Sequence, residues 1–512
     1  MKNKLLSISI LFLACIVGFL YWFTLQDQTK LPSKEWSRSY SVNTEVSNFS
    51  TLQSVQEENG YTISLLDFKK LIVLSCDKEM TCNENRTHES LNTYKNSWSD
   101  KTDSYFIKDD TLVHSNISSG QTVVATNVSN FSKTKNTLVY WTEDQEIIVL
   151  NSPFSNEKQR FKINDPVYFV KVLGNDIFII TKKDKEDLYT VYNLTDQLSK
   201  LFQFNVSSQE ILSSLDIIQL EDNNFSLIQD KKTISGGTST NKIVTALFNL
   251  SFNQEPTYNI LSFVEEQSGS PLKDVYSPTF YQGTSGPMIT VSSTFLDETG
   301  EKVTKVFVGN FSEDTIKVNA LTKIPNRYER PIFLDEQTVA YFKMKGSNRF
   351  LEYSSSDELK KQESNGIMAG DYKEAGYTLL GKLFNGFILV LFSFVWIIIT
   401  FIVSYGTVLL LQKLRFAHSF KTAFIVHIIT LFSIQTYFIY NFTSIESIIY
   451  KIPYISENWH FVILLVISTI LSIIPLKILR YKLMEDTFNL FVVYTTFMNL
   501  IILFFLVGPY LF

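Results

Sequence analysis

The stretch DIFIITKKDKEDLYTVYNLTDQLSKLFQFNV, residues 176–206, decides the fold class. An apolar run from Asp176 to Thr181 is followed by a charged turn, a second apolar run from Leu188 to Tyr192 and a third from Leu198 to Val206. In the third run apolar and polar residues alternate, which is the period of a half-buried β-strand. Strands of this length joined by short polar turns predict antiparallel hairpins.

Units of the same kind recur from Tyr61 to Tyr353 at spacings of roughly 30 to 60 residues, close to the period of propeller blades. We therefore expect residues 36–353 to form an all-β domain. A β-propeller of about six to eight blades is favoured. A pair of β-sandwiches is the alternative, because alternating strands alone do not separate the two architectures.

The composition is too apolar for a purely soluble chain, since 45% of the residues are hydrophobic and 19% are charged. An aromatic content of 14% excludes intrinsic disorder, and 19 Gly, 12 Pro and 3 Cys exclude a collagen-like or disulfide-dense scaffold. The net charge of -5 argues against a nucleic-acid binder.

Five apolar stretches without charged residues are long enough to cross a hydrocarbon core of about 30 Å as helices. We expect membrane helices over residues 5–25, after a short cytoplasmic start within residues 1–25, and in a C-terminal four-helix bundle over 383–411, 423–440, 459–476 and 488–507. A cleaved signal peptide is the competing interpretation of the first stretch, but its apolar run is longer than such peptides need. The polar segments 26–35 and 354–382 are expected to be linkers.

Basic residues beside these stretches set the predicted orientation, because short loops rich in Lys and Arg remain in the cytoplasm. Under strict alternation of five helices they all fall on one side: Lys2, Lys4, Lys413, Arg415, Lys421, Lys477, Arg480 and Lys482. We expect a multi-pass protein of a bacterial cell membrane with a cytoplasmic N-terminus. Residues 26–382 and the C-terminus would then be extracytoplasmic, and any cytoplasmic response would need a partner.

The polar residues noted inside the apolar stretches are His427 and Gln435 in 423–440 and Asn489 and Asn499 in 488–507. We expect Gln435 and Asn499 to form interhelical hydrogen bonds. His427 lies one turn from the cytoplasmic end of its stretch and is expected to reach toward the membrane interface. The stretches contain no Asp, Glu, Lys or Arg, which counts against ion-coupled transport.

Cys76 and Cys82 are separated by five residues and are expected to form a disulfide that closes a hairpin loop. The chain has five His, with no His-x-x-x-His pair and no Gly-x-Ser-x-Gly motif. We therefore predict no enzyme activity, no catalytic, cofactor or metal site and no cofactor. The acidic pairs Glu265-Glu266 and Asp109-Asp110 could flank a glycosidic bond or bind calcium, although such pairs are typical of solvated turns.

The predicted function is a binding or sensing module that is held in the lipid bilayer and docks on other membrane or envelope proteins. The alternative is a permease-like subunit of an ABC-type export or bacteriocin and immunity system. One N-terminal helix, a large outer domain and clustered C-terminal helices resemble the layout of macrolide-exporter and cell-division type permeases. That resemblance covers topology only, and it implies an ABC transporter ATPase or permease as partner. An extracytoplasmic hydrolase is the second alternative.

Overall fold

The computed structural model describes most of the 512 residues, namely 2–46, 51–67, 69–89, 91, 95–151, 158–183, 186–221, 223–251, 255–296, 302–313, 315–323, 327–385, 387–414, 419–442, 457–479 and 485–508. The chain divides into two compact units. One unit comprises Leu31–Asn365, and the other comprises Met1–Lys30 together with Gly366–Phe512.

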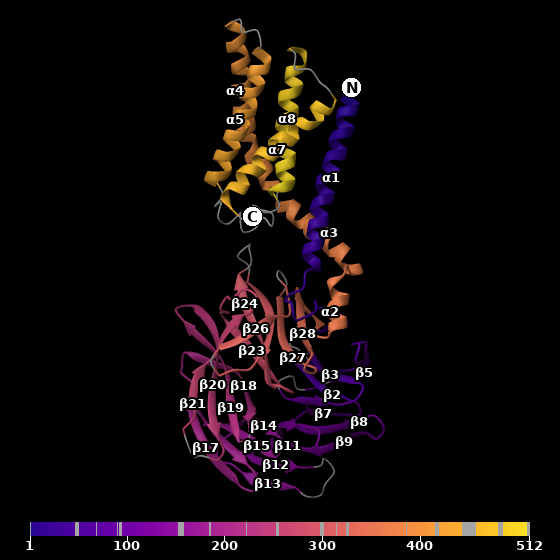
Figure 1. Cartoon of the computed structure of the whole chain (residues 1–512). Coiled ribbons are helices and arrows are strands. Elements are labelled where there is room, and N and C mark those ends of the chain that lie inside the picture. The colour runs from indigo at the N-terminus through magenta and orange to yellow at the C-terminus, as the bar shows by residue number, and fades with distance from the viewer. Residues whose placement is uncertain are drawn as a thin grey trace. The chain divides into compact units, whose positions relative to one another are not determined.

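The unit Leu31–Asn365 is a β-propeller whose strand order gives seven blades. Figure 1 shows this unit with its strands labelled. Blade 1 is built from β2 (Thr51–Glu57), β3 (Gly60–Asp67), β4 (Lys70–Asp77) and β5 (Cys82–His88). Blade 2 is built from β6 (Ser97–Ser99), β7 (Asp103–Lys108), β8 (Thr111–Asn116) and β9 (Gly120–Ala125). Blade 3 is built from β10 (Val128–Lys133), β11 (Leu138–Thr142), β12 (Glu146–Leu150) and β13 (Gln159–Lys162).

The deciding stretch of sequence lies in the next blade. Blade 4 is built from β14 (Val167–Leu173), β15 (Asp176–Lys182), β16 (Leu188–Leu194) and β17 (Leu198–Asn205). Blade 5 is built from β18 (Glu210–Glu221), β19 (Asn224–Ser235), β20 (Thr238–Asn249) and β21 (Thr257–Ile260). The propeller prediction is confirmed, and the β-sandwich alternative is excluded by this strand order.

The last two blades depart from simple sequential pairing. Blade 6 has five strands: β23 (Val275–Gly283), β24 (Gly286–Leu296), β25 (Lys302–Asn310), β26 (Thr315–Ala320) and β22 (Ser262–Glu265), which pairs parallel to β26. Blade 7 consists of β27 (Arg327–Phe333), β28 (Thr338–Lys345), β29 (Asn348–Ser355) and the first strand of the chain, β1 (Tyr40–Val46).

The strand β1 closes the propeller by pairing antiparallel with β29. Tyr40 lies opposite Tyr353, and their rings are stacked with centroids 5.2 Å apart. Ser54 of blade 1 donates a hydrogen bond to the carbonyl oxygen of Phe333 in blade 7 at 2.7 Å. The two ends of the domain thus meet in one sheet, and hydrogen bonds continue from blade 7 to blade 1.

The hydrophobic core lies between neighbouring blades. Leu65 and Ile63 of blade 1 are fully buried against Phe342 and Leu351 of blade 7. Similar clusters join blades 4 and 5 and blades 5 and 6. Since one face of each strand packs on the blade before it and the other on the blade after it, the central strands read as nearly continuous apolar runs.

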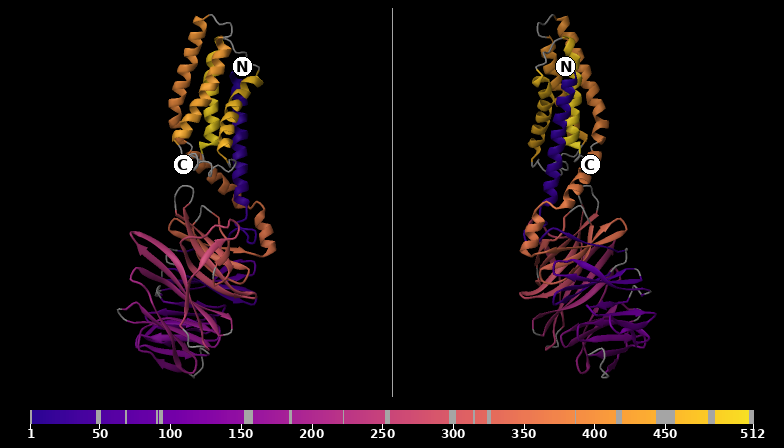
Figure 2. Two further views of the ribbon diagram at one scale, coloured as in Figure 1. Left: turned by 60° about the vertical axis from the view of Figure 1, so that its left-hand side comes forward. Right: turned by 90° about the vertical axis from the view of Figure 1, so that its right-hand side faces the viewer.

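The second unit is helical and contains α1 (Lys2–Thr29), α3 (Ala369–Asn385), α4 (Phe387–Lys413), α5 (Ser419–Phe442), α7 (Asn458–Ile478) and α8 (Glu485–Leu506). Figure 2 shows α3 beside α1, and Tyr21 donates a hydrogen bond to the carbonyl oxygen of Tyr372 at 2.9 Å. Two helices, α2 (Glu358–Asn365) in the propeller unit and α3, occupy the segment 354–382 that was expected to be a linker.

Four helices in the described residues are long and apolar enough to cross a membrane by length and composition: Lys4–Thr29, Ser393–Lys413, Trp459–Ile478 and Thr487–Leu506. The fifth expected span, 423–440, lies in α5 but is not one of the four. A span at α5 therefore stays a prediction.

Replacement of Leu351 by Ala tests the contact between blades 7 and 1. Leu351 is fully buried, so Leu351→Ala is expected to lower the free energy of unfolding by about 2–5 kcal/mol. The measurement is urea-dependent hydrogen exchange of blade 7 peptides in the full chain. Val123→Ala, at a side chain that is 65% exposed, is the control. Equal losses in the two variants would contradict this packing.

Candidate functional site

An open cleft of about 980 Å³ lies where blades 6, 7 and 1 adjoin. Turns and strand ends of these blades line it, together with the segments just before β1 and just after β29. Its lining residues are Glu35, Trp36, Gln56, Glu266, Tyr281, Thr284, Ser285, Met288, Val308, Gly309, Asn310, Thr315, Lys317, Asn319, Asp335, Glu336, Gln337 and Ser356. Loops and turns displayed by a rigid scaffold are common positions for binding residues.

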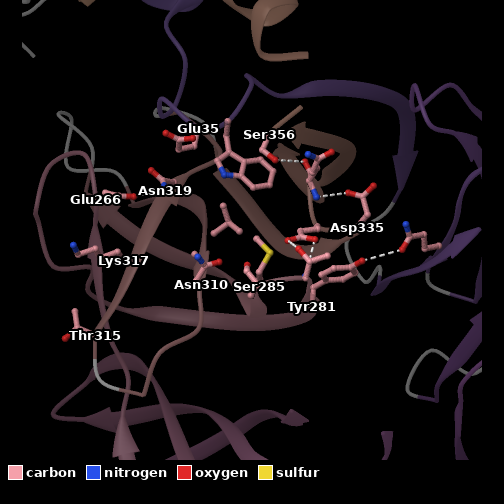
Figure 3. A pocket seen from close by; sticks show the side chains of 18 residues that line it. Glu35, Glu266, Tyr281, Ser285, Asn310, Thr315, Lys317, Asn319, Asp335 and Ser356 are labelled. Carbon is pink, nitrogen blue, oxygen red and sulfur yellow. Dashed lines mark hydrogen bonds between the residues drawn. The ribbon is translucent and has the colours of Figure 1, made fainter. Parts of the chain in front are cut away.

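The cleft is acidic. Its lining includes four carboxylates, Glu35, Glu266, Asp335 and Glu336, and one ammonium group, Lys317. Figure 3 shows Glu266, Asn319 and Lys317 on one side of the opening and Asp335 with Tyr281 on the other. A concave surface lined mainly by one sign of charge concentrates ligands of the opposite sign.

Two of these carboxylates are held by hydrogen bonds from turn residues. Glu336 accepts from the backbone N–H of Thr284 at 3.2 Å and from the Thr284 hydroxyl at 2.9 Å. Asp335 accepts from the backbone N–H of Gln337 at 2.8 Å and from the hydroxyl of Tyr61. These contacts tie blade 6 to blade 7 and blade 7 to blade 1.

A third carboxylate, Glu266, accepts from the side-chain amide of Asn319 at 3.0 Å. All the donors named for Glu266, Asp335 and Glu336 are neutral, so these hydrogen bonds position the carboxylates without neutralising them. Burial, followed by its contact with Asp335, raises the pKa of the Tyr61 hydroxyl. Burial and the charges of Asp335 and Glu336 also raise the pKa of Tyr281. Both tyrosines therefore remain neutral donors.

The floor of the cleft depends on a glycine. An added Cβ at Gly309 would lie 2.2 Å from the carbonyl oxygen of Lys317, which is far inside van der Waals contact. The absence of a side chain allows β25 and β26 to approach closely beneath the opening. A larger residue here would have to move the backbone that carries Lys317.

The acidic surface continues beyond the cleft into a neighbouring hollow of about 450 Å³, which shares Gln56, Asp335 and Gln337 with it. This hollow adds five carboxylates and two ammonium groups, namely Glu57, Glu58, Glu79, Asp357, Glu363, Lys78 and Lys360. Lys360 is paired with Glu79 at 2.6 Å and with Glu363 at 3.7 Å. The larger surface is therefore also acidic.

The central channel forms a second cavity of about 480 Å³, lined by residues from six blades, and it shares Gln56 and Tyr281 with the acidic cleft. Asp216 in this channel is paired with Lys171 at 2.6 Å. Burial lowers the pKa of Lys133 to about 8, and its ammonium lies 4.5 Å from the centre of the Trp98 ring. The charged groups of the channel are thus already engaged by neighbours within the propeller.

The disulfide predicted from the sequence is present. Cys76 of β4 and Cys82 of β5 are bonded and occupy opposite positions on paired strands. The loop that they close contacts blade 7 and α2, because Tyr353 donates to the carbonyl oxygen of Glu79 at 3.4 Å and Lys360 pairs with the carboxylate of Glu79. The disulfide therefore stabilises a loop beside the closing sheet.

Three polar residues of the apolar stretches, His427, Gln435 and Asn499, are buried in the interior of the helical unit, whereas Asn489 is exposed. Gln435 donates to the side-chain oxygen of Asn499 at 2.5 Å, and both residues are fully buried. His427 is also fully buried and contacts Ser404 at 2.7 Å. The expectation that His427 reaches outward is wrong, because polar side chains of α4 and α8 surround its ring.

The residues expected to set orientation are only partly described. Lys2, Lys4, Lys413, Lys421 and Lys477 lie in helices. Arg415, Arg480 and Lys482 lie outside the described residues. Their role in orientation stays a prediction.

The acidic cleft was not predicted from the sequence. Of the two acidic pairs considered there, Asp109-Asp110 forms a turn with positive φ at both residues, and Glu266 lies in the cleft. In the described part of the chain, no group of three or more His, Cys, Asp or Glu side chains has a metal-binding arrangement.

The chain matches no protein-family model and none of the curated proteins with which it was compared. Solved structures resemble this chain at low identity. The WD40 β-propeller domain of Doa1 is 11% identical with a TM-score of 0.39, covering 64% of this chain and 99% of that one.

The structure of YCF48 bound to D1 peptide is 10% identical with a TM-score of 0.38, covering 64% of this chain and 97% of that one. The WD40 domain of Toxoplasma gondii coronin is 10% identical with a TM-score of 0.38, covering 66% and 91%. These similarities assign no ligand, and the assignment of seven blades comes from the strand order itself.

A buried carboxyl group lies between blades 5 and 6. Asp230 of β19 is 3% exposed, and one of its oxygens accepts from the backbone N–H of Ser277 at 2.9 Å. The other oxygen has no hydrogen-bond partner among the described residues. Burial raises the pKa of Asp230 to about 6, so the folded state binds this proton more tightly than the unfolded state does.

Asp230→Asn tests this site through the pH dependence of stability. The proton at Asp230 stabilises the fold most below about pH 4, and this contribution, up to about 3 kcal/mol, is lost as the pH rises through about 6. The Tm of the parent protein is therefore expected to fall relative to that of Asp230→Asn as the pH rises from 5 to 7.5. The exposed Asp144→Asn is the control. A constant difference across this range would refute the assignment.

Proposed function

We propose that this chain is a membrane-anchored docking protein whose propeller binds a cationic segment of a partner protein in the acidic cleft. The observation that carries the proposal is the charge of the cleft. Four carboxylates and one ammonium group line a cleft of about 980 Å³. A cavity of this size accommodates several residues of a peptide or loop.

The hydrogen bonds at the cleft support recognition of a cation. Thr284, Asn319 and Tyr61 donate to carboxylates without carrying charge, so the negative potential is retained and its position is fixed. A lysine or arginine side chain that enters would gain charge-assisted hydrogen bonds. Because complementary charge speeds association, the interaction should be sensitive to salt.

The helical unit supports anchoring in a lipid bilayer. Four helices have the length and hydropathy of membrane spans, and α5 lies between two of them in the sequence. With the basic residues of the connecting segments in the cytoplasm, residues 26–382 would be extracytoplasmic. The partner would then be a membrane or envelope protein, and an ABC transporter subunit remains the more specific prediction.

Charge removal in the cleft tests the proposed binding. The probe is a fluorescent hexalysine peptide added to the full chain in nanodiscs at low salt. Glu266→Gln together with Glu336→Gln is expected to weaken binding at least about fivefold, because two cleft charges are lost. Glu143→Gln with Asp144→Asn, in the exposed turn between β11 and β12, removes the same charge elsewhere and should leave affinity unchanged. Equal affinity of all three proteins would exclude cation recognition by the cleft.

Cysteine labelling tests the proposed orientation. In a background with Cys15→Ala, Ser119→Cys in an exposed turn of blade 2 should react with a membrane-impermeant maleimide on intact cells. Gln412→Cys, near the end of α4, should react only after the cells are permeabilised. The opposite pattern would show that the propeller lies in the cytoplasm, and it would contradict docking on an extracytoplasmic partner.

A further inference from the structure

The helical unit contains a buried histidine whose two ring nitrogens both face hydroxyl oxygens. His427 of α5 has no exposed surface. Its Nδ1 lies 2.7 Å from the hydroxyl of Ser404 in α4. Its Nε2 lies 3.2 Å from the hydroxyl of Thr495 and 3.3 Å from that of Thr496, both in α8.

The protons of these three hydroxyl groups are directed elsewhere. Ser404 donates to the carbonyl oxygen of residue 400 at 2.5 Å, which is the usual i−4 bond of a helical Ser or Thr. Thr495 donates to the carbonyl oxygen of residue 491 at 2.6 Å, and Thr496 donates to that of residue 492 at 2.8 Å. A hydroxyl group has one proton, so each oxygen offers only its lone pairs to the ring.

This arrangement fits an imidazole ring with N–H groups on both nitrogens. A neutral imidazole has one N–H and would satisfy the hydroxyl of Ser404 or those of Thr495 and Thr496, but not both sides at once. In the neutral state one of these hydroxyls must rotate from its backbone carbonyl to the bare ring nitrogen: Ser404 to Nδ1, or Thr495 or Thr496 to Nε2. In the charged state the hydroxyls keep their carbonyl bonds and accept from the ring.

We propose that His427 is a reversible proton-binding site inside the helical unit. The hydroxyl oxygens of Ser404, Thr495 and Thr496 accept hydrogen bonds from the protonated ring. The bound proton would connect α4, α5 and α8 through one charged ring, so its occupancy would be coupled to the packing of these helices. The site is independent of the acidic cleft and of its proposed ligand.

The surroundings make proton binding reversible rather than permanent. The apolar stretches of the helices that pack against α5 have no charged residue. Their other titratable side chains are Tyr405 of α4, His460 of α7 and Tyr494 of α8; Tyr494 contacts the hydroxyl of Ser9 at 2.6 Å. A positive charge on the His427 ring is disfavoured by desolvation and stabilised by the three hydroxyl oxygens, without a carboxylate counter-ion.

The test is ¹⁵N NMR of the full chain in lipid nanodiscs with labelled histidine, because ring nitrogen shifts distinguish neutral imidazole from imidazolium. The chain has five His, and His427→Gln identifies the signals of residue 427. As the pH falls from about 8 to about 4, the ring of His427 is expected to change from neutral to doubly protonated.

Loss of the hydroxyl ligands should weaken proton binding. Thr495→Val with Thr496→Val is expected to lower the proton affinity of His427 by roughly threefold or more, because the acceptors for Nε2–H are lost. Ser404→Ala should lower the proton affinity in the same way, because the acceptor for Nδ1–H is lost. This variant provides the test if the double variant does not fold. Thr407→Val is the matched control, since the hydroxyl of Thr407 donates to the carbonyl oxygen of Val403 in the same helix at 2.7 Å.

Two results would overturn the proposal. One is a ring of His427 that remains neutral throughout the pH range in which the protein is folded. The other is a titration that is the same in the parent protein, in Ser404→Ala and in the double variant.

Discussion

The pairing of β1 with β29 is the interaction on which the rest of the propeller depends. Blade 7 is complete only when the first strand of the domain joins its last three. Without β1, the edge of β29 would present unpaired backbone groups, and the apolar contact between blades 7 and 1 would lose Val42 and Val46.

The same closure builds the acidic cleft. Trp36 and Glu35 reach the cleft from the segment that leads into β1, four and five residues before Tyr40, and Ser356 reaches it because it immediately follows β29. Asp335 connects the cleft to blade 1 through the hydroxyl of Tyr61. A ligand in the cleft would therefore contact the two ends of the domain and blade 6 together, and binding should stabilise the closed ring.

The propeller could be predicted because each strand carries its signal locally. In β17, Phe202 and Phe204 are buried while Gln203 and Asn205 are exposed, as the alternating pattern indicated. The closing strand was not recognised, since Tyr40–Val46 reads as a short mixed segment whose partner lies about 300 residues away. Sequence periodicity reports which face of a strand is buried but not which distant strand it joins.

The sites were harder to predict for the same reason. The carboxylates of the cleft, such as Glu35, Glu266 and Glu336, come from separate segments and look like ordinary turn or linker residues in the sequence. The polar residues within apolar stretches were more informative. Gln435 and Asn499 stood out because polar groups in such stretches need partners, and the structure joins them. The hydroxyl partners of His427 did not stand out, since Ser and Thr are common in apolar helices.

Hydrogen exchange of the full chain in nanodiscs, with and without hexalysine peptide, tests most directly whether closure by β1 forms a cation-binding cleft. The account predicts that amides of β1 exchange as slowly as those of β29, and that the peptide protects the turns around residues 56, 284 and 336. Fast exchange of β1, or protection confined to other blades, would contradict it.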